Sequence, residues 1–404
     1  MPPPFSFTIL VLSFLSLLTA TATATTTIGV VYTPSNFPTP ERVASTLTSL
    51  RIPSVHILHP TPAAIRAFAY SNISLILSVP NSLLPSFAAN VSFASEWLFY
   101  HVLPFHPRAH ISLISVGTDV VSSSSILAPT SDPSTFLLPA MRNLHLSLLD
   151  LGIKTISVST SFSFINTVSQ AFPPSSAEFH PAINPLLVKP ILQFLAETNS
   201  SLLIDLYPYT VYKVQPAIPL GFALFREDPF NFRDDPITAA RYRNLFDVMV
   251  DAVVTALAIT GHENMKLILS QTGWPSSSSG ENEEATPAYA QMYLKGLISH
   301  LKSGLGTPLK KDGVAEVYIY ELFDGDDEEA NNPMEMVNNS SASSSTSDRA
   351  DDQHQRWGIL YPNMTMKFNL DFSGSEKLSA MPAAWLVELA LGIISHVVVY
   401  FLLL

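Results

Sequence analysis

The sequence predicts an α/β protein whose parallel strands close into a (β/α)8 barrel, and three observations lead to this prediction. Short runs of β-forming apolar residues recur eight times along the chain. The stretches between them are long enough for helices, the pattern of a parallel sheet covered on both faces. Residues 25–374, which remain when two apolar ends are set aside, have a length that is usual for one such barrel.

The eight predicted strands are Thr27–Tyr32, Ser54–Leu58, Ile73–Val79, Ile111–Val116, Thr155–Ser161, Ser201–Leu206, Lys266–Ser270 and Ala315–Leu322. The clearest helical pattern lies between the sixth and seventh strands, from Tyr242 to Leu257, because its apolar residues recur at helical spacing. A count of eight favours a closed barrel over an open sheet. In such a barrel the functional residues lie at the carboxyl ends of the strands.

Residues 1–24 have the pattern of a secretory signal peptide. An apolar run from Phe5 to Leu18 precedes small residues, and Ala22–Ala24 fits a small-x-small cleavage site. The alternative is a membrane anchor. The run is shorter than the ~20 residues that a membrane span needs, which favours cleavage.

Residues 375–404 have the pattern of a GPI-anchor signal. Small residues at Ser373–Ser375 precede a short polar spacer and an apolar terminal run, Ala383–Leu404. Ser379-Ala380 is a second possible attachment point, and a simple tail anchor is the alternative. Together the two ends predict a protein outside the cell, held on the plasma membrane by lipid.

Composition excludes several function classes. The formal net charge of −12 argues against a nucleic-acid partner, and the absence of cysteine excludes disulfide and thiol chemistry. The histidines have no ligand spacing, so neither a metal site nor a cofactor is expected. We expect a monomer. Residues 331–355 are rich in Ser, Asn and Asp and predict a disordered loop. Sequons that agree with secretion start at Asn72, Asn90, Asn199, Asn338, Asn339 and Asn363.

Motifs at the predicted strand ends resemble those of the plant endo-1,3-β-glucosidases, the β-1,3-glucanases of glycoside hydrolase family 17. The matching stretches follow the family's order and are Ile28–Tyr32, Val79–Ser82, Val116–Val120, Leu138–Asn143, Phe172–Ser175, Leu206–Tyr209, Tyr242–Asp247, Gly273–Ser276 and Trp357–Leu360. The resemblance covers nearly all of residues 27–372. It implies a (β/α)8 barrel that acts on β-1,3-glucan, and it agrees with the GPI signal because many plant members carry that anchor.

The resemblance also assigns the two catalytic positions, and this sequence departs from the family at both. The family's acid/base Glu ends a Val-Gly-Asn-Glu-Val motif on the fourth strand, where this chain has Val116-Gly-Thr-Asp-Val120 and therefore Asp119. The family's nucleophilic Glu stands in Ser-Glu-Ser-Gly-Trp-Pro on the seventh strand, where this chain has Gln271. A carboxamide cannot readily form and release a glycosyl ester, so the resemblance implies a damaged catalytic pair.

Two further departures accompany these. An assisting Glu of the family is replaced by Gly325, and the family's Arg-Leu-Tyr-Asp on the second strand is His56-Ile-Leu-His59 here. The residues that would bind the sugar by resemblance are Tyr32, Thr118, Tyr207, Tyr209, Trp274 and Phe323. Flat aromatic rings can bury the apolar faces of sugars, although the same rings can also simply fill the barrel mouth.

Asp205 and Glu321 are possible substitute carboxylates, because each lies near a strand end where the family usually has an uncharged residue. Alternation along a strand leaves the direction of their side chains open. Three functions follow as hypotheses. The chain is a surface homologue that recognises β-1,3-glucan but hydrolyses it weakly or not at all, an active endo-1,3-β-glucosidase that uses Asp119 and a substitute carboxylate, or a structural surface protein without glycan affinity.

Overall fold

Eight parallel strands close into a barrel in the order β1-β10-β9-β6-β5-β4-β3-β2, which confirms the predicted fold class. The strands are β1 (Thr27–Tyr32), β2 (Ser54–Ile57), β3 (Ser74–Val79), β4 (His110–Thr118), β5 (Ser157–Ser163), β6 (Leu202–Asp205), β9 (Leu267–Thr272) and β10 (Glu316–Ile319). Each corresponds to one predicted run. The computed structural model describes residues 26–35, 37–121, 134–226, 228, 230–277, 283–324 and 355–373.

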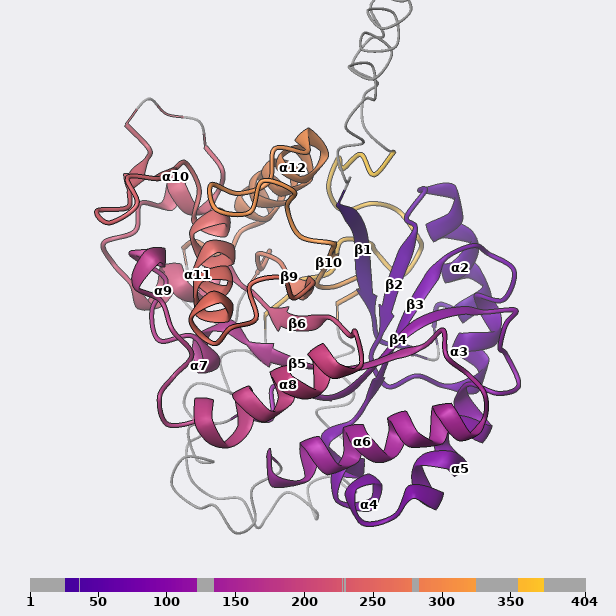
Figure 1. Ribbon diagram of the computed structural model, residues 1–404. Coiled ribbons are helices and arrows are strands. Elements are labelled where there is room, and N and C mark those ends of the chain that lie inside the picture. The colour runs from indigo at the N-terminus through magenta and orange to yellow at the C-terminus, as the bar shows by residue number, and fades with distance from the viewer. Residues whose placement is uncertain are drawn as a thin grey trace, which may run out of the picture. The chain divides into compact units, whose positions relative to one another are not determined.

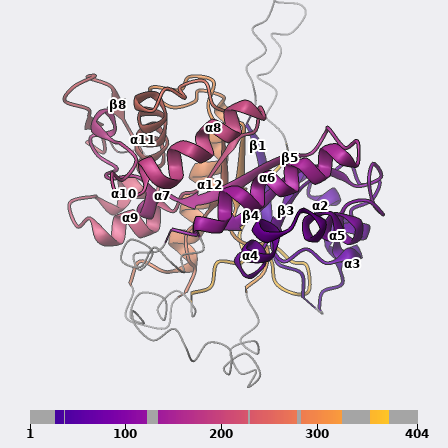
Figure 2. The same cartoon turned by 60° about the horizontal axis from the view of Figure 1, so that its bottom comes forward.

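Helices surround the strands on the outside of the barrel (Figures 1 and 2). They are α2 (Pro40–Ser49), α3 (Pro62–Ala67), α4 (Leu84–Ala89), α5 (Val91–His101), α6 (Ser134–Asp150), α7 (Phe164–Thr167), α8 (Lys189–Glu197), α9 (Pro208–Val214), α10 (Leu220–Ala223), α11 (Leu245–Ile259) and α12 (Pro287–Ser303). Outside the barrel, β7 (Arg233–Asp234) and β8 (Arg241–Tyr242) form a small antiparallel ribbon.

Helix α11 begins three residues later than its apolar pattern indicates. The Asn244 side chain accepts a hydrogen bond from the Asp247 backbone N–H and so caps the helix, which starts at Leu245. Tyr242 lies in β8 and is fully buried, with its hydroxyl 2.8 Å from Asp251. Tyr242 is buried before the N-cap, at a spacing that also fits a residue inside the helix. The apolar pattern alone therefore does not determine where α11 begins.

The core has two layers, because alternate residues of each strand face opposite sides. The larger layer lies between the strands and the helices and includes Val30 and Tyr32 of β1. A second cluster is formed by alternate strand residues and fills the inside of the barrel, with Val31, Ile76, Leu113, Leu203, Ile268 and Tyr318. The inside of the barrel is therefore a packed core, and ligands can approach only at its ends.

Several predictions concern residues that the structure does not describe. Residues 1–24, Gly325, residues 331–354 and residues 375–404 all lie outside the described ranges. Of the sequon asparagines, Asn72, Asn90, Asn199 and Asn363 are described and exposed. Within the described ranges, no helix combines the length and the hydrophobicity that a membrane crossing requires.

Candidate functional site

The carboxyl ends of four neighbouring strands, β4, β5, β6 and β9, bring together Asp119 and Gln271, the residues that the resemblance assigns to the two catalytic positions. Asp119 directly follows β4, and Gln271 is the second-to-last residue of β9. Asp205 is the last residue of β6. It pairs with Ser163 of β5 on one side and with Gln271 of β9 on the other, and the register of the β6–β9 pairing shifts just before Asp205. The predicted catalytic positions and Asp205 therefore belong to one end of the barrel.

Asp119 is held by the junction between β5 and α7. Its backbone N–H donates to the Ser161 carbonyl (3.1 Å), and its φ of +41° lies in the left-handed region. One carboxylate oxygen accepts from the Ser163 backbone N–H at 3.3 Å, and the other accepts from the Asn166 side-chain amide at 3.0 Å. Both oxygens of this carboxylate therefore have N–H donors, one from the end of β5 and one from α7.

Gln271 is buried, with 7% of its surface exposed, and is fixed by one short hydrogen bond. The hydroxyl of Tyr207, which lies two residues beyond the end of β6, donates to Gln271 Oε1 at 2.6 Å. With its oxygen engaged in this way, the amide offers N–H donors to anything else that it contacts. It is neutral and cannot serve as a nucleophile or a general base.

Three half-buried aromatic rings form a cluster beside Gln271. The Tyr207 ring lies 5.3 Å from Trp357 and 6.0 Å from Tyr320, and Tyr320 lies 6.0 Å from Trp357, between ring centroids. The cluster combines the end of β6, the end of β10 and the 355–373 segment, which joins β10 through the bond from Ile359 N–H to the Glu321 carbonyl (3.0 Å).

The resemblance assigns sugar binding to Tyr207 but not to Tyr320 or Trp357. Trp357 is part of the Trp-Gly-Ile-Leu stretch that supports the resemblance, and Tyr320 follows the eighth strand at alternate spacing from Tyr318. These two signals were present in the sequence. Nothing in them indicated that both rings would meet Tyr207.

Three other predicted sugar-binding aromatics are buried in the wall of the barrel. Trp274 is 1% exposed, Tyr32 is 0% exposed and Tyr209 is 4% exposed. The Trp274 indole N–H donates to the Glu284 carbonyl at 2.8 Å, and its ring packs against Tyr209. A ring without an exposed face cannot stack on a sugar, so we assign these three residues to packing.

The remaining predicted residues lie at the same end of the barrel. The backbone N–H of Thr118 donates to the Asn81 side chain and its carbonyl accepts from it, both at 2.9 Å. Phe323 is half-buried and packs edge-on against Tyr32, with 6.4 Å between ring centroids. Glu321 is buried, and its backbone pairs with that of Trp357 and Ile359.

Asp205 is the most unusual group at this end, because it is a buried carboxyl group inside the barrel. The Ser270 hydroxyl donates to one of its oxygens at 2.6 Å, and the Ser161 hydroxyl donates to the other at 3.2 Å. Burial raises the pKa of Asp205 to about 7, and the charge of Asp119 acts in the same direction, while the two hydroxyl donors oppose this shift.

His56 extends this polar layer across the inside of the barrel. Its Nδ1 lies 3.2 Å from the Ser270 carbonyl and its Nε2 lies 2.8 Å from the Ser78 hydroxyl. Because a carbonyl only accepts, Nδ1 carries the proton and Nε2 accepts from Ser78. Burial lowers the pKa of His56 to about 4, so the ring is neutral at physiological pH. This position therefore supplies no positive charge.

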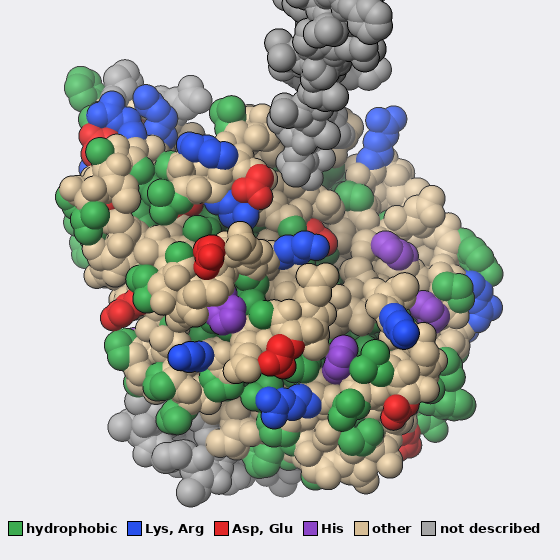
Figure 3. All heavy atoms as spheres, in the orientation of Figure 1, with side chains coloured by type: hydrophobic (Ala, Val, Ile, Leu, Met, Phe, Trp, Pro, Cys, Tyr) green, Lys and Arg blue, Asp and Glu red, His purple; other side chains and the backbone are tan. Residues whose placement is uncertain are grey.

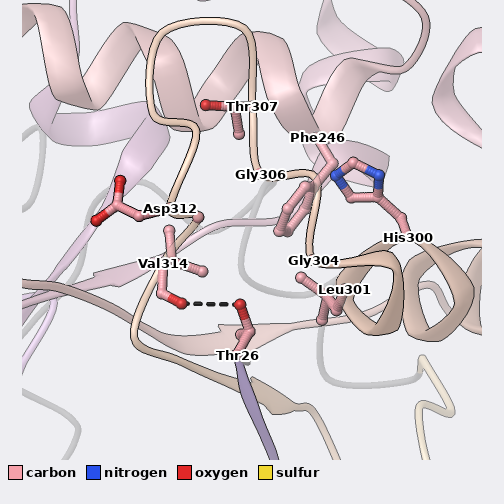
Figure 4. A pocket seen from close by; sticks show the side chains of 10 residues that line it. Thr26, Phe246, His300, Leu301, Gly304, Gly306, Thr307, Asp312 and Val314 are labelled. Atoms are coloured by element: carbon pink, nitrogen blue, oxygen red, sulfur yellow. Dashed lines mark hydrogen bonds between the residues drawn. The ribbon is translucent and has the colours of Figure 1, made fainter. Parts of the chain in front are cut away.

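A small pocket lies at the opposite end of the barrel (Figure 4). Thr26 precedes β1 and Val314 precedes β10, and the Thr26 hydroxyl donates to the Val314 carbonyl at 2.9 Å. The pocket is therefore at the amino ends of the strands, away from the altered catalytic positions. In the described part of the chain, no group of three or more His, Cys, Asp or Glu residues is arranged to hold a metal ion.

Charged side chains of both signs are interspersed over the face shown in Figure 3, without a continuous basic patch. This distribution agrees with the acidic net charge of the chain. It gives no electrostatic footprint for a nucleic acid on that face.

Comparison with known proteins gives a consistent result. The family model for glycosyl hydrolases family 17 matches residues 28–372. Glucan endo-1,3-beta-glucosidase 12 of Arabidopsis thaliana is 34% identical over 88% of this chain, and the chain spans 62% of that relative's length. A glucan endo-1,3-beta-glucosidase of Nicotiana tabacum is 30% identical, over 86% of this chain and 90% of its own length.

Solved structures agree. The β-1,3-glucanase and allergen CJP38 of Cryptomeria japonica pollen superposes with a TM-score of 0.73 at 30% identity, covering 86% of this chain and 99% of its own. A plant β-glucan endohydrolase superposes with a TM-score of 0.70 at 30% identity, covering 85% of this chain and all of its own. With a matching family model, similar relatives and the same closed barrel, this chain belongs to glycosyl hydrolases family 17.

Proposed function

We propose that this protein recognises β-1,3-glucan at the carboxyl end of its barrel and hydrolyses it weakly or not at all. The observation that carries the proposal is the hydrogen bond from Tyr207 to Gln271. It keeps the side chain at the nucleophile position ordered and in place, while that side chain is a neutral amide. The site thus retains a binding arrangement without the group that would form a glycosyl intermediate.

Retaining hydrolysis requires two carboxyl groups ~5–5.5 Å apart, one to donate a proton and one to attack the sugar. Gln271 cannot attack, and it cannot offset the positive charge that develops on the sugar ring. Asp119 is one methylene shorter than the family's glutamate, and the β5–α7 junction holds both of its oxygens. An error of ~1 Å in such a group can cost ~10²-fold in rate.

Recognition of the sugar requires other features, and the chain retains them. The half-buried cluster of Tyr207, Tyr320 and Trp357 offers aromatic surface beside Gln271. Sugars present apolar C–H faces to such rings and hydroxyl groups to amides. The Arabidopsis and tobacco relatives are named for endo-1,3-β-glucosidase activity, which makes β-1,3-glucan the ligand class to propose.

The test compares hydrolysis of laminarin and binding of laminarihexaose by the wild type and by Gln271→Glu/Asp119→Glu. We expect the wild type to bind the hexasaccharide and to release few reducing ends, and the double variant to release more. Gln193→Glu on the outer helix α8 is the matched control for the added charge. Laminarin hydrolysis by the wild type at the rate of an ordinary endoglucanase contradicts the proposal, and so does the absence of any hexasaccharide binding.

A second candidate function is an active endo-1,3-β-glucosidase that uses Asp119 and a substitute carboxylate. The register pairing of Asp205 with Gln271 favours Asp205 over Glu321 for that role. The corresponding test is residual hydrolysis by the wild type, Asp205→Asn and Glu321→Gln. A loss of measurable activity in Asp205→Asn alone would identify it as the substitute.

For the cellular setting, we propose a secreted monomer held at the outer face of the plasma membrane by a GPI anchor. The patterns of residues 1–24 and 375–404 support this proposal. Release of the full-length protein from plant membranes by phosphatidylinositol-specific phospholipase C is the expected result. Retention after that treatment, with extraction by detergent only, contradicts the lipid anchor.

A further inference from the structure

A carboxyl group stands beside the altered nucleophile position, one strand away from where the family's nucleophile would be. Asp205 on β6 and Gln271 on β9 are register partners, and adjacent strands lie ~4.8 Å apart. The side chain of Asp205 is inside the barrel, where Ser161 and Ser270 donate to its two oxygens. These donors fix the carboxyl group below the end of the strand.

Among the residues that the structure describes, none supplies a cation that balances Asp205. On β2, His56 reaches Ser270 but is neutral. Directly after β4, Asp119 repels a charge on Asp205. Tyr207, next along β6, donates its hydroxyl to Gln271. In the described part of the chain, no ion pair involves Asp205. Its negative charge is therefore available to a ligand at the barrel mouth.

We propose that Asp205 supplies the negative charge of this site in place of a carboxylate at position 271, and that it makes the site select a protonated sugar ring over a neutral one. This inference rests on the proposed sugar site at the same strand ends. In this role Asp205 forms no bond to the anomeric carbon, unlike a nucleophile at position 271. It acts through space on a cation that occupies the sugar position.

The size and sign of the effect follow from electrostatics. A buried carboxylate and a ring ammonium ion ~6 Å apart attract each other enough to change affinity by at least about tenfold at an effective dielectric constant of ~20. The carboxyl group must be ionised, and its ionised fraction grows as pH rises through about 7. Affinity for a protonated ring therefore increases from about pH 5.5 to about pH 8, whereas affinity for a neutral glucan stays nearly constant.

The experiment measures by calorimetry the binding of two probes over this pH range. One is an isofagomine carrying a β-1,3-linked glucose, an iminosugar whose protonated nitrogen stands at the anomeric position, and the other is neutral laminaritriose. For the wild type we expect iminosugar affinity to rise about tenfold with pH, with no such rise for laminaritriose. In Asp205→Asn the iminosugar rise disappears while laminaritriose binding persists. Asp150→Asn, at the exposed end of α6, is the matched control.

Two further variants separate a direct electrostatic role from a structural one. Asp119→Asn removes the repelling neighbour, so the midpoint of the pH-dependent rise moves to lower pH. Ser270→Ala removes the shorter donor to Asp205, so the midpoint moves to higher pH, and this variant serves as the test if Asp205→Asn does not fold. A midpoint that is the same in the wild type and in both variants overturns the inference.

The outcomes for the two probes distinguish this inference from the proposed function. If laminaritriose binds and iminosugar affinity is the same in the wild type and Asp205→Asn, the inference fails and glucan recognition stands. If only the iminosugar binds, with the expected dependence on Asp205, the charge assignment stands and glucan recognition fails. If neither probe binds, both fail.

Discussion

The Tyr207 hydroxyl donates a 2.6 Å hydrogen bond to the side-chain oxygen of Gln271. A tyrosine so placed would stabilise a carboxylate at the same position, and here it orders an amide. The bond therefore fixes the Gln271 side chain at the carboxyl end of the barrel. Under the proposed function, this side chain keeps the geometry of the nucleophile position without its charge.

Tyr207→Phe removes the donor and keeps the ring. Because Gln271 then has no fixed orientation from this bond, we expect laminarihexaose affinity to fall by about five- to tenfold, corresponding to about 1 kcal/mol. Calorimetric titration measures the change. Tyr212→Phe is the control, because Tyr212 lies on helix α9, which starts directly after Tyr207, but its hydroxyl is hydrogen-bonded to Glu284; this variant should leave affinity unchanged. Equal affinities for the wild type and Tyr207→Phe would show that the Tyr207–Gln271 hydrogen bond does not contribute to glucan binding.

The two tryptophans at this end of the barrel should behave oppositely. Trp357 is half-buried within the aromatic cluster, so Trp357→Ala should weaken laminarihexaose binding by about tenfold and change the melting temperature little. Trp274 is fully buried in the wall, so Trp274→Ala should lower the free energy of unfolding by about 3–5 kcal/mol. Urea unfolding and calorimetric binding on both variants check this. Loss of stability in Trp357→Ala and loss of binding alone in Trp274→Ala would contradict the assignment of Trp357 to binding and Trp274 to packing.

Restoring a carboxylate at position 271 should succeed only in part while Asp205 is present. Gln271→Glu places a second carboxyl group as the register partner of Asp205, with Asp119 nearby and no described cation paired with Asp205. Repulsion then disfavours ionisation of the new nucleophile. We expect Gln271→Glu/Asp119→Glu/Asp205→Asn to hydrolyse laminarin at least about tenfold faster than the variant that retains Asp205, with an optimum at lower pH. Equal rates and equal pH profiles would show that Asp205 does not oppose the nucleophile.

Stability should fall as pH rises through the range in which Asp205 ionises. The folded-state pKa is about 7 and the unfolded value is 3.8, so between these values the folded state binds the proton that the unfolded state releases. The free energy of unfolding therefore decreases with rising pH, by up to about 4 kcal/mol for this group.

Burial raises the pKa of Asp251 to about 6, so Asp251 also makes the folded state less stable as pH rises. The wild-type pH profile is therefore compared with that of Asp205→Asn, which still contains Asp251. Urea unfolding between pH 4.5 and pH 8 should give a flatter profile for Asp205→Asn than for the wild type. Parallel profiles would mean that Asp205 does not take up a proton on folding.

The strand count and the placement of Asp119 and Gln271 at the carboxyl ends of their strands could be predicted from the sequence, because each depends on local patterns and motifs. The directions of the side chains could not. Tyr32 lies next to Val31 on β1, yet Val31 faces the inside of the barrel and Tyr32 packs against the helix layer. The sequence does not indicate which residues of β1 face the inside of the barrel and which face the helices, so the prediction that Tyr32 lines the mouth could not be checked from sequence alone.

The pairing of β6 with β9 shows a second limit. The register shifts between Ile204 and Asp205, and this shift makes Asp205 the partner of Gln271 while Ser270 still donates to it. Such an irregularity has no signature in this sequence. The position of Trp357 in the aromatic cluster could not be predicted from the sequence either, because it depends on how the 355–373 segment pairs with the end of β10.

The most direct test of a glucan site without a nucleophile is one calorimetric titration of laminarihexaose into the wild-type protein. Binding gives a saturable heat for each injection, and hydrolysis gives a heat flow that continues afterwards. The account predicts saturable binding with a prompt return to baseline. A sustained heat of hydrolysis, with shortened oligosaccharides in the cell at the end, would contradict it.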